Sequence, residues 1–178
     1  RNFTKKEKNN FSKELSIISK INHPLFVEFI GYNRFDFNEN HRPVVVTEII
    51  KKESLNDIIQ MDREKQEIFG WNDTKKLIFI YGIASGMSCL HSLGIVHQNL
   101  ILENILFDDF LYPKIANFSC SLKYSDASEK FKELMANDVY SFSVIAYEIL
   151  INEKISLNDR PKLKDDIESK DKELDFLR

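Results

Sequence analysis

The sequence predicts an α+β fold in which helices outweigh strands. Residues 9–21, 72–91 and 138–150 repeat apolar side chains at helical spacing, and residues 43–50 form a β-branched run typical of a buried strand. With 178 residues, of which 43% are hydrophobic, the chain can bury one substantial core or two small ones. We find no internal repeats.

The first predicted helix covers residues 9–21, where Phe11, Leu15 and Ile18 fall on one face. The polar run before it, residues 4–8, is interpreted as a solvated helix entry. The β-branched run over residues 43–50 comes later, and by itself it fits any core strand.

The longest amphipathic pattern runs from Asn72 to His91 and predicts a helix with an Asn/Asp cap at its start. Its apolar face is predicted to contain Leu77, Ile80, Tyr81, Ala84 and either Met87 or Ser88. Gly94, just past the end of this pattern, suits a left-handed C-terminal cap. We expect His91 to cap or pack rather than to bind a ligand.

Residues 138–150 predict a central helix with a broad apolar face. That face is predicted to contain Val139, Phe142, Ile145, Ala146 and Ile149. A buried carboxylate at Asp138 would be costly unless hydrogen bonds engage it. Further on, residues 166–178 mix charged residues with Ile167, Leu174 and Leu177 in a helical pattern.

Two short segments are the most informative part of the chain. The first reads His97-Gln98-Asn99-Leu100-Ile101-Leu102-Glu103-Asn104, and the second reads Asn117-Phe118-Ser119. They resemble the protein kinase family, in which the segments read His-Arg-Asp-Leu-x-x-x-Asn and Asp-Phe-Gly. In that family the first Asp is the catalytic base and the second holds magnesium. Here Asn99 and Asn117 stand in place of both acids.

The resemblance covers nearly the whole chain and implies a kinase-like fold. Residues 1–50 would form a partial small lobe that ends in a hinge, and residues 51–178 a truncated, mainly helical large lobe. Residues 53–59 resemble the short helix after the hinge, with Ser54 as its N-cap. The family's strand Lys and glycine-rich loop would lie upstream of this chain. Residues 158–163 resemble the approach to a later helix, and the helices that complete the large lobe are missing.

The resemblance also implies a nucleotide site. Its residues would be Glu14, Thr47, Glu48, Ile50 and Leu106. Thr47 stands at the gatekeeper position, Glu48 to Ile50 at the hinge, and Glu14 where the family pairs a Glu with the strand Lys. Asn104 matches the family's second metal ligand. Alternatively, Asn104 only satisfies backbone groups of its own loop, as Asn commonly does.

The replacement of the two acids by asparagines predicts weak catalysis and weak metal binding at this site. A carboxamide has no basic site near neutral pH, so Asn99 occupies the base position in degenerate form. A neutral amide oxygen is also a poor ligand for a hard dication, which makes Asn117 a degenerate metal position. ATP and magnesium would be held loosely if at all, and we assign no firm cofactor. We expect the 97–104 and 117–119 segments to converge beside the 138–150 helix.

Other positions of the resemblance also differ according to their role: those that carry charge for catalysis are changed, and those that pack the core are kept. Gln98 replaces an Arg that in the family pairs with a phosphorylated loop, and Ile101 replaces a Lys that contacts the transferred phosphate. The positions that stack the family's core are apolar or matched, namely Ile18, Phe29, His97 and Phe118, with Asp138 at their foot. We interpret His97 as a packing residue rather than a general base.

Composition narrows the partners and the compartment. A formal net charge of −3, with Lys and Glu interspersed, argues against a nucleic-acid surface. The longest unbroken apolar runs are too short to span a membrane, and the start is not a signal peptide. Two cysteines suit a reducing compartment, which favours the cytoplasm, and the cysteines and histidines have no zinc-site spacing.

These observations predict a catalytically impaired, pseudokinase-like domain resembling Ser/Thr kinases that acts in signalling by binding another protein, such as a kinase or signalling partner. The short activation segment from Asn117 to Asp138 lacks the family's Ala-Pro-Glu anchor, which favours loss of substrate docking. One alternative is an active ATP-dependent kinase that phosphorylates protein Ser, Thr or Tyr. Another is a module that binds ATP without transferring phosphate.

Overall fold

The structure is a computed structural model that describes residues 4–50, 53–125 and 128–153. In chain order its elements are α1 (Lys5–Ile18), β1 (Phe29–Asn33), β2 (Val44–Thr47), α2 (Leu55–Arg63), α3 (Asp73–Ser92), β3 (Ile95–Val96), η1 (Leu102–Asn104), β4 (Ile105–Phe107), β5 (Pro113–Ile115), β6 (Leu122–Lys123) and α4 (Glu129–Ile151). The predicted α+β class is confirmed. The segments predicted over residues 158–163 and 166–178 lie outside the described residues.

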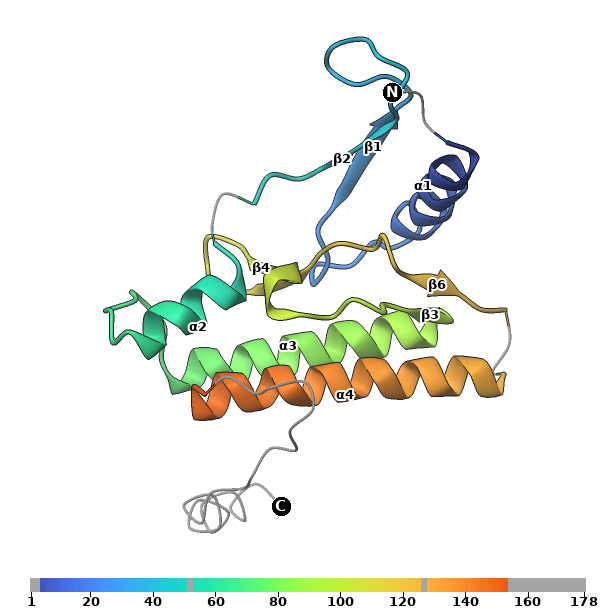
Figure 1. Cartoon of the computed structure of the whole chain (residues 1–178). Coiled ribbons are helices and arrows are strands. Elements are labelled where there is room, and N and C mark those ends of the chain that lie inside the picture. The colour runs from blue at the N-terminus through green and yellow to red at the C-terminus, as the bar shows by residue number, and fades with distance from the viewer. Residues whose placement is uncertain (1–3, 51–52, 126–127, 154–178) are drawn as a thin grey trace.

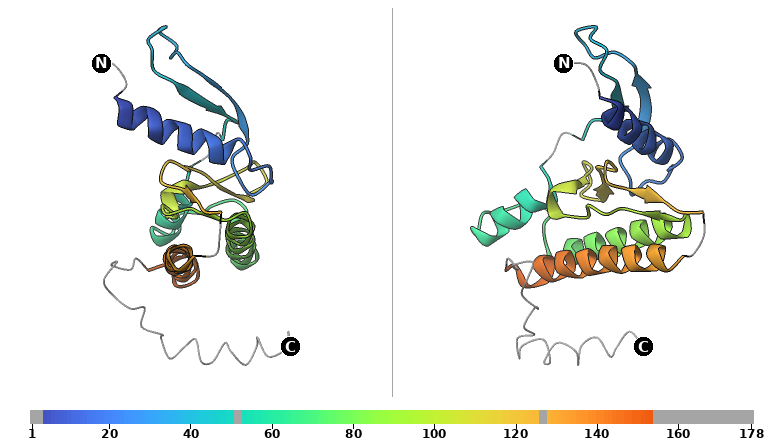
Figure 2. Two further views of the ribbon diagram at one scale, coloured as in Figure 1. Left: turned by 90° about the vertical axis from the view of Figure 1, so that its right-hand side faces the viewer. Right: turned by 45° about the vertical axis from the view of Figure 1, so that its right-hand side comes forward.

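The elements form layers that bring distant segments together. α1 and the β1–β2 hairpin lie at one end of the molecule, and α3 and α4 lie side by side at the other (Figures 1 and 2). The short strands from β3 to β6 lie between them (Figure 1). β1 pairs antiparallel with β2, placing Tyr32 opposite Val45. β3 with β6 and β4 with β5 form two further antiparallel pairs.

The local signals at the helix ends are confirmed. The Asn72 side chain caps α3 by accepting a hydrogen bond from the Lys75 amide at 3.0 Å. The Ser54 amide and hydroxyl both donate to the Asp57 carboxylate, at 2.8 and 2.6 Å, and so fix the start of α2. Gly94 has φ +71°, and a Cβ there would lie 2.5 Å from the Tyr124 carbonyl oxygen. Only glycine fits this turn.

The predicted apolar face of α3 was wrong in part. Leu77 and Tyr81 are 60% and 77% exposed. The buried residues of this helix are Phe79, Gly82, Ile83, Gly86, Met87 and Leu90. A Cβ on Gly82 would lie 2.5 Å from the Pro113 side chain, so the glycines allow β5 to approach the helix closely. The helix therefore packs through a face that hydrophobicity alone does not reveal.

The predicted bounds and face of the last helix also need correction. α4 begins at Glu129 rather than at Asp138, and the Ser128 hydroxyl caps it by accepting from the Phe131 amide at 3.2 Å. Phe131 and Leu134 extend its apolar side and pack with Val96. Ile145 and Ile149 are buried as predicted, whereas Val139 is 57% exposed. The segment between Asn117 and the helix is accordingly shorter than expected.

Among the described residues, α4 alone is long and apolar enough, by length and composition, to cross a membrane. Core helices share these properties. α4 packs against α3 and β3 and carries the buried carboxylates Asp138 and Glu148. Of the most apolar 18-residue window of α4, 28% is buried in the structure, and the absence of a membrane partner stays a prediction.

Candidate functional site

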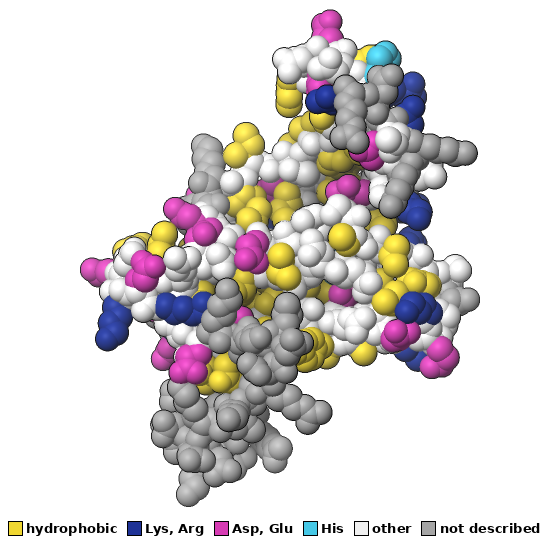
Figure 3. Space-filling model, viewed as in Figure 1, with side chains coloured by type: hydrophobic (Ala, Val, Ile, Leu, Met, Phe, Trp, Pro, Cys, Tyr) yellow, Lys and Arg dark blue, Asp and Glu magenta, His cyan; other side chains and the backbone are white. Residues whose placement is uncertain are grey.

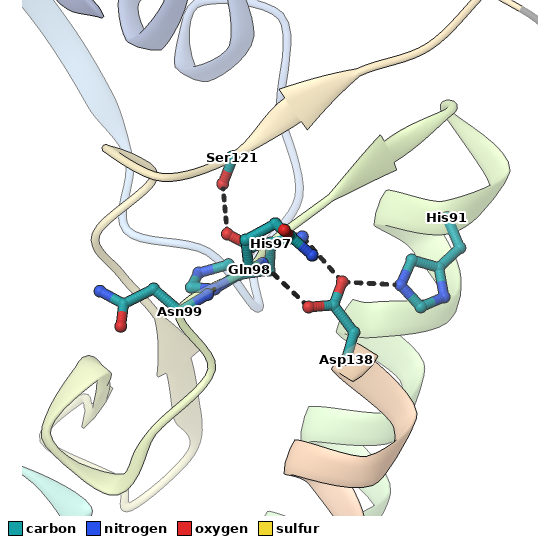
Figure 4. Close-up of polar contacts among 6 residues, drawn as sticks. All are labelled: His91, His97, Gln98, Asn99, Ser121 and Asp138. Atoms are coloured by element: carbon teal, nitrogen blue, oxygen red, sulfur yellow. Dashed lines mark hydrogen bonds and ion pairs between the residues drawn. The ribbon is translucent and has the colours of Figure 1, made fainter. Parts of the chain in front are cut away.

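The site is organised around the carboxylate of Asp138, which is 1% exposed. Asp138 Oδ2 accepts hydrogen bonds from the His97 amide at 2.7 Å and from His91 Nε2 at 3.0 Å (Figure 4). Asp138 Oδ1 accepts from the Gln98 amide at 2.9 Å. The 97–104 segment therefore lies beside α4, as predicted. His91 serves as a hydrogen-bond partner of the anchor, a role that its sequence context did not indicate.

These hydrogen bonds hold a strained backbone. Gln98 has φ +63°, a conformation that costs a non-glycine residue about 1–3 kcal/mol. Burial by itself raises the pKa of Asp138, but the hydrogen bonds from His91, His97 and Gln98 outweigh it, and the net pKa is lowered. Asp138 is therefore ionised at neutral pH and can hold two adjacent amides in this turn.

His97 is fully buried and packs as a neutral ring. Its Nε2 donates to the Ala116 carbonyl oxygen at 3.1 Å, and its Nδ1 accepts from the Asn99 amide at 3.3 Å. Burial lowers its pKa, which keeps the ring uncharged at neutral pH. Both ring nitrogens are engaged with backbone groups, in agreement with a packing role.

An aromatic stack connects the two ends of the molecule. The His97 and Phe118 rings lie 5.3 Å apart, and Phe118 lies 5.9 Å from Phe26. Ile18 is buried in the same core, and Phe29 packs against it. The predicted stacking residues are thus brought together. Phe26 was missed, because its contact with Phe118 depends on the bridge that pairs Phe26 with Ile115, in which the Val27 amide donates to the Ile115 carbonyl oxygen, and not on any local pattern.

The three asparagines of the motif form a network of amides. Asn104 Nδ2 donates to the main-chain carbonyl oxygen of Asn99 at 2.8 Å, and Asn104 Oδ1 accepts from Asn117 Nδ2 at 3.2 Å. The Ser119 hydroxyl donates to Asn117 Oδ1 at 2.6 Å. Asn117 has φ +64°, which Asn tolerates better than most residues. The side-chain amides of Asn104 and Asn117 are therefore engaged with each other and with their loops.

This arrangement does not fit a magnesium ion. Magnesium prefers carboxylate oxygens in octahedral geometry, whereas both ligand positions here are amides. The Asn104 oxygen already accepts a hydrogen bond, and Asn117 turns its NH2 group, not its oxygen, toward Asn104. Within the described part of the chain, no three His, Cys, Asp or Glu side chains lie close enough together to hold a metal ion.

The predicted nucleotide-site residues line one small pocket between α1, β2 and the 106–118 region. Its lining includes Glu14, Thr47, Glu48, Ile50, Leu106 and Asn117. Asn99 lies outside this lining, and its side chain points away from Asp138 (Figure 4). The pocket volume of about 260 Å³ lies below the roughly 300–1,000 Å³ typical of small-molecule sites. Binding of a nucleotide by these residues stays a prediction.

The Glu48 side chain makes structural contacts within the domain. Its Oε1 accepts from Lys114 Nζ at 2.7 Å and from the Glu28 amide at 2.9 Å. Burial raises the pKa of Glu48, but the Lys114 and Glu28 hydrogen bonds outweigh it and lower the net pKa. Glu48 therefore ties β2 to β5. Lys114 was missed from the sequence because a lone lysine in a short strand carries no local signal.

Replacing Glu14 by Gln is expected to raise the free energy of unfolding slightly at neutral pH. Burial raises the pKa of the Glu14 carboxyl above its ordinary value of 4.5. A raised folded-state pKa means that stability falls as pH rises above 4.5, where the carboxyl must ionise in the folded protein. Urea unfolding at pH 4 and pH 7 should show a gain at pH 7 only. Glu103→Gln, at an exposed position, should show none.

Comparison with known proteins identifies the family. The profile of protein tyrosine and serine/threonine kinases matches residues 1–136. The chain belongs to the protein kinase family. Its relatives include a G-type lectin S-receptor-like serine/threonine-protein kinase of Arabidopsis thaliana, 28% identical over 172 residues, with 84% of this chain and 20% of that protein covered. The kinase domain is thus related to Ser/Thr kinases.

Two further relatives show the same partial coverage. The dual specificity protein kinase pyk3 of Dictyostelium discoideum is 32% identical over 155 residues, covering 78% of this chain and 11% of that protein. A probable protein kinase of Arabidopsis thaliana is 28% identical over 182 residues, covering 86% of this chain and 48% of that protein. The chain thus spans less than half the length of each of these relatives.

Proposed function

We propose that this kinase domain no longer transfers phosphate and acts by binding another protein. The observation that carries the proposal is the hydrogen bond between Asn117 and Asn104, at 3.2 Å, where the family's machinery would hold a magnesium ion. In the family, a carboxylate at the Asn117 position and the amide at the Asn104 position would bind the same metal ion. Here the Asn117 amide donates a hydrogen bond to Asn104 instead.

The missing groups together account for a large loss of rate. General-base catalysis contributes about 10²–10⁴-fold, and Asn99 cannot supply it. Electrostatic stabilisation of the transferred phosphate by metal and cations usually contributes even more to the rate, and the Asn117, Gln98 and Ile101 positions each lack the family's charged group. Four positions of one site are changed, namely Gln98, Asn99, Ile101 and Asn117. This number of changes supports a domain that no longer catalyses phosphate transfer rather than one that has lost a single catalytic group.

The retained parts support a scaffold. The Asp138 anchor, the His97–Phe118–Phe26 stack and the Glu48–Lys114 ion pair hold the two ends of the domain together with this chain's own side chains. A partner protein would meet a preorganised surface, which lowers the cost of association. We place this activity in the cytoplasm, with a kinase or another signalling protein as partner, and the free thiols of Cys89 and Cys120 support a reducing compartment.

The test is transfer of radiolabelled phosphate from ATP to generic Ser, Thr and Tyr substrates by the purified protein, with magnesium and with manganese. We expect incorporation no higher than that of a mock preparation. The Asn104→Ala variant separates intrinsic activity from a contaminating kinase. Transfer that exceeds the mock and disappears in Asn104→Ala would show an active kinase instead.

A second candidate is ATP binding without transfer. The clustering of Thr47, Glu48 and Ile50 in one pocket favours it. Thermal unfolding with ATP, with and without magnesium, separates this function from a pure scaffold. A rise in the unfolding temperature that does not need magnesium would support nucleotide sensing, and no rise would support the scaffold alone.

A further inference from the structure

Two turns at one end of the domain each expose a phenylalanine to solvent. One turn joins α2 to α3, and the other joins β4 to β5. Phe69 in the first turn is 99% exposed, and Phe110 in the second is 76% exposed. A Cβ on Gly70 would lie 3.1 Å from the Leu111 side chain, so the two turns are in contact. We call residues 64–73 and 108–112 together the aromatic tip.

The turn between α2 and α3 holds Phe69 outside the core. The Trp71 amide donates to the Ile68 carbonyl oxygen at 3.1 Å, and Gly70 has φ +81°, as the third residue of a type II turn requires. Ile68 and Trp71 pack against the main core, and Trp71 Nε1 also donates to Asp62 at 3.2 Å. Both ends of the turn are therefore held by the core, and Phe69 lies at the exposed apex between them.

The turn between β4 and β5 is fixed in a strained conformation. Asp108 Oδ1 accepts from the Phe110 and Tyr112 amides at 2.9 Å each. Lys75 Nζ donates to the Phe110 carbonyl oxygen at 2.7 Å. Leu111 has φ +57°, which is an outlier for a bulky residue, and in this conformation it packs against the main core while Phe110 stays exposed. Strain of this kind is typical of functional sites, which suggests a use for the exposed ring.

The aromatic tip is acidic. Its charged side chains are five carboxylates and one lysine, namely Glu64, Glu67, Asp73, Asp108, Asp109 and Lys65. Two lysines that follow in α3 are engaged within the domain, Lys75 with the Phe110 carbonyl oxygen and Lys76 with Asp62 at 3.0 Å. Figure 3 shows Asp and Glu side chains, with Lys and Arg side chains among them, at the left of the molecule, where α2 lies. The two exposed rings therefore lie in a surface of negative charge.

This charge distinguishes between the partners that could cover the rings. The carboxylates would repel an anionic membrane surface, and the tips of two copies of the chain would repel each other. An apolar groove bordered by Lys and Arg on another protein is complementary to both the rings and the carboxylates. Because both turns are already held in place, the rings would also lose little conformational entropy on binding.

We propose that the aromatic tip binds a folded partner protein by inserting Phe69 and Phe110 into an apolar groove bordered by Lys or Arg. This assignment names the binding surface of the proposed scaffold and rests on that function. The two fail separately. Phosphate transfer by the purified protein would overturn the proposed function whatever the tip binds, and a partner that binds elsewhere would overturn only the assignment to the tip.

The test places the photoreactive residue p-benzoylphenylalanine at position 69, 110 or 81 of the full chain, in an extract of cells that contain the protein. Tyr81 on α3 is 77% exposed and lies outside the tip, so position 81 is the matched control for an exposed ring. We expect positions 69 and 110 to crosslink to the same protein and position 81 not to. Mass spectrometry of the crosslinked peptides should place both contacts in an apolar groove that Lys or Arg residues border.

The purified partner then allows affinities to be measured by calorimetry. Phe69→Ala and Phe110→Ala should each weaken binding by about tenfold, and Tyr81→Ala should change it by less than about twofold. Glu67→Lys should also weaken binding, and a Lys→Glu change at the border of the partner's groove should restore it, a result that loss of folding cannot produce.

Four results would overturn the proposal. These are crosslinks from positions 69 and 110 to lipid or to a second copy of this chain, crosslinks to a surface bordered by acids, a loss of affinity in Tyr81→Ala as large as in Phe69→Ala, and no crosslink from either position. Unfolding temperatures of the variants provide the folding control, because an exposed ring contributes little to the stability of the domain.

Discussion

Replacing Asp138 by Ala is expected to lower the free energy of unfolding by about 3–5 kcal/mol, a large part of the roughly 5–15 kcal/mol of a typical domain. The substitution leaves the His97 and Gln98 amides without their acceptor and frees the left-handed turn at Gln98. At about 2–4 °C per kcal/mol for a chain of this size, thermal unfolding should move down by roughly 6–20 °C. Calorimetry or circular dichroism measures this shift directly.

The exposed neighbour Asn137 provides the control, because Asn137→Ala changes helix propensity without touching the anchor. Asp138→Asn should show an intermediate loss of about 2–3 kcal/mol, since an amide offers one acceptor where two amides need acceptors. The pH profile is a second readout. The lowered pKa of Asp138 means that its contribution is present above pH 3.8 and is lost as pH falls through the folded-state pKa. Equal stabilities of Asp138→Ala and Asn137→Ala would refute the anchor.

Replacing Asn117 by Asp is expected to destabilise the protein by about 1 kcal/mol in the absence of magnesium. A carboxylate cannot donate to Asn104 Oδ1, so two acceptor oxygens would face each other at the distance of 3.2 Å that the hydrogen bond now spans. Magnesium should reverse the loss, because a carboxylate beside an amide oxygen restores part of the family's ligand set. Thermal unfolding of both proteins over a magnesium series measures the effect.

Asn137→Asp, which makes the same chemical change at an exposed position of α4, controls for nonspecific binding of the cation. The unchanged protein and Asn137→Asp should show no rise in unfolding temperature with magnesium. If the unchanged protein were stabilised by magnesium as strongly as Asn117→Asp, the amide network would not be what replaces the cation.

The parts of the fold that depend only on residues close together in the sequence could be predicted. The caps at Asn72 and Ser54 and the turn at Gly94 were found because each depends on hydrogen bonds or dihedral angles within a few residues. The buried face of α3 was not, because that helix is apolar on most sides and its contact face contains Gly82 and Gly86. Glycine adds nothing to a hydrophobic pattern, yet its missing Cβ permits the contact with β5.

The same division holds for the site. The motif and the family made it possible to predict that Asn99, Asn104 and Asn117 lie close together, as their hydrogen bonds show. The direction of the amides could not, because the Asn117–Asn104 hydrogen bond joins residues thirteen positions apart whose contact exists only after β4 and β5 have paired. Nor could the start of α4 be placed, although Phe131, Leu134 and Met135 continue its helical spacing back toward Ser128.

The hydrogen bond between the Asn104 and Asn117 side chains joins two uncharged amides without a metal ion, so under the proposed scaffold function this contact would not depend on the divalent-ion concentration of the cell. A metal ion bound between these two positions would stabilise the folded protein by an amount that grows with the logarithm of the free metal concentration. The hydrogen bond between Asn104 and Asn117 has no such dependence. In the scaffold function, in which the domain binds no nucleotide, its shape would not change with the ATP level of the cell. Its output would then be set by how much of it is synthesised and degraded.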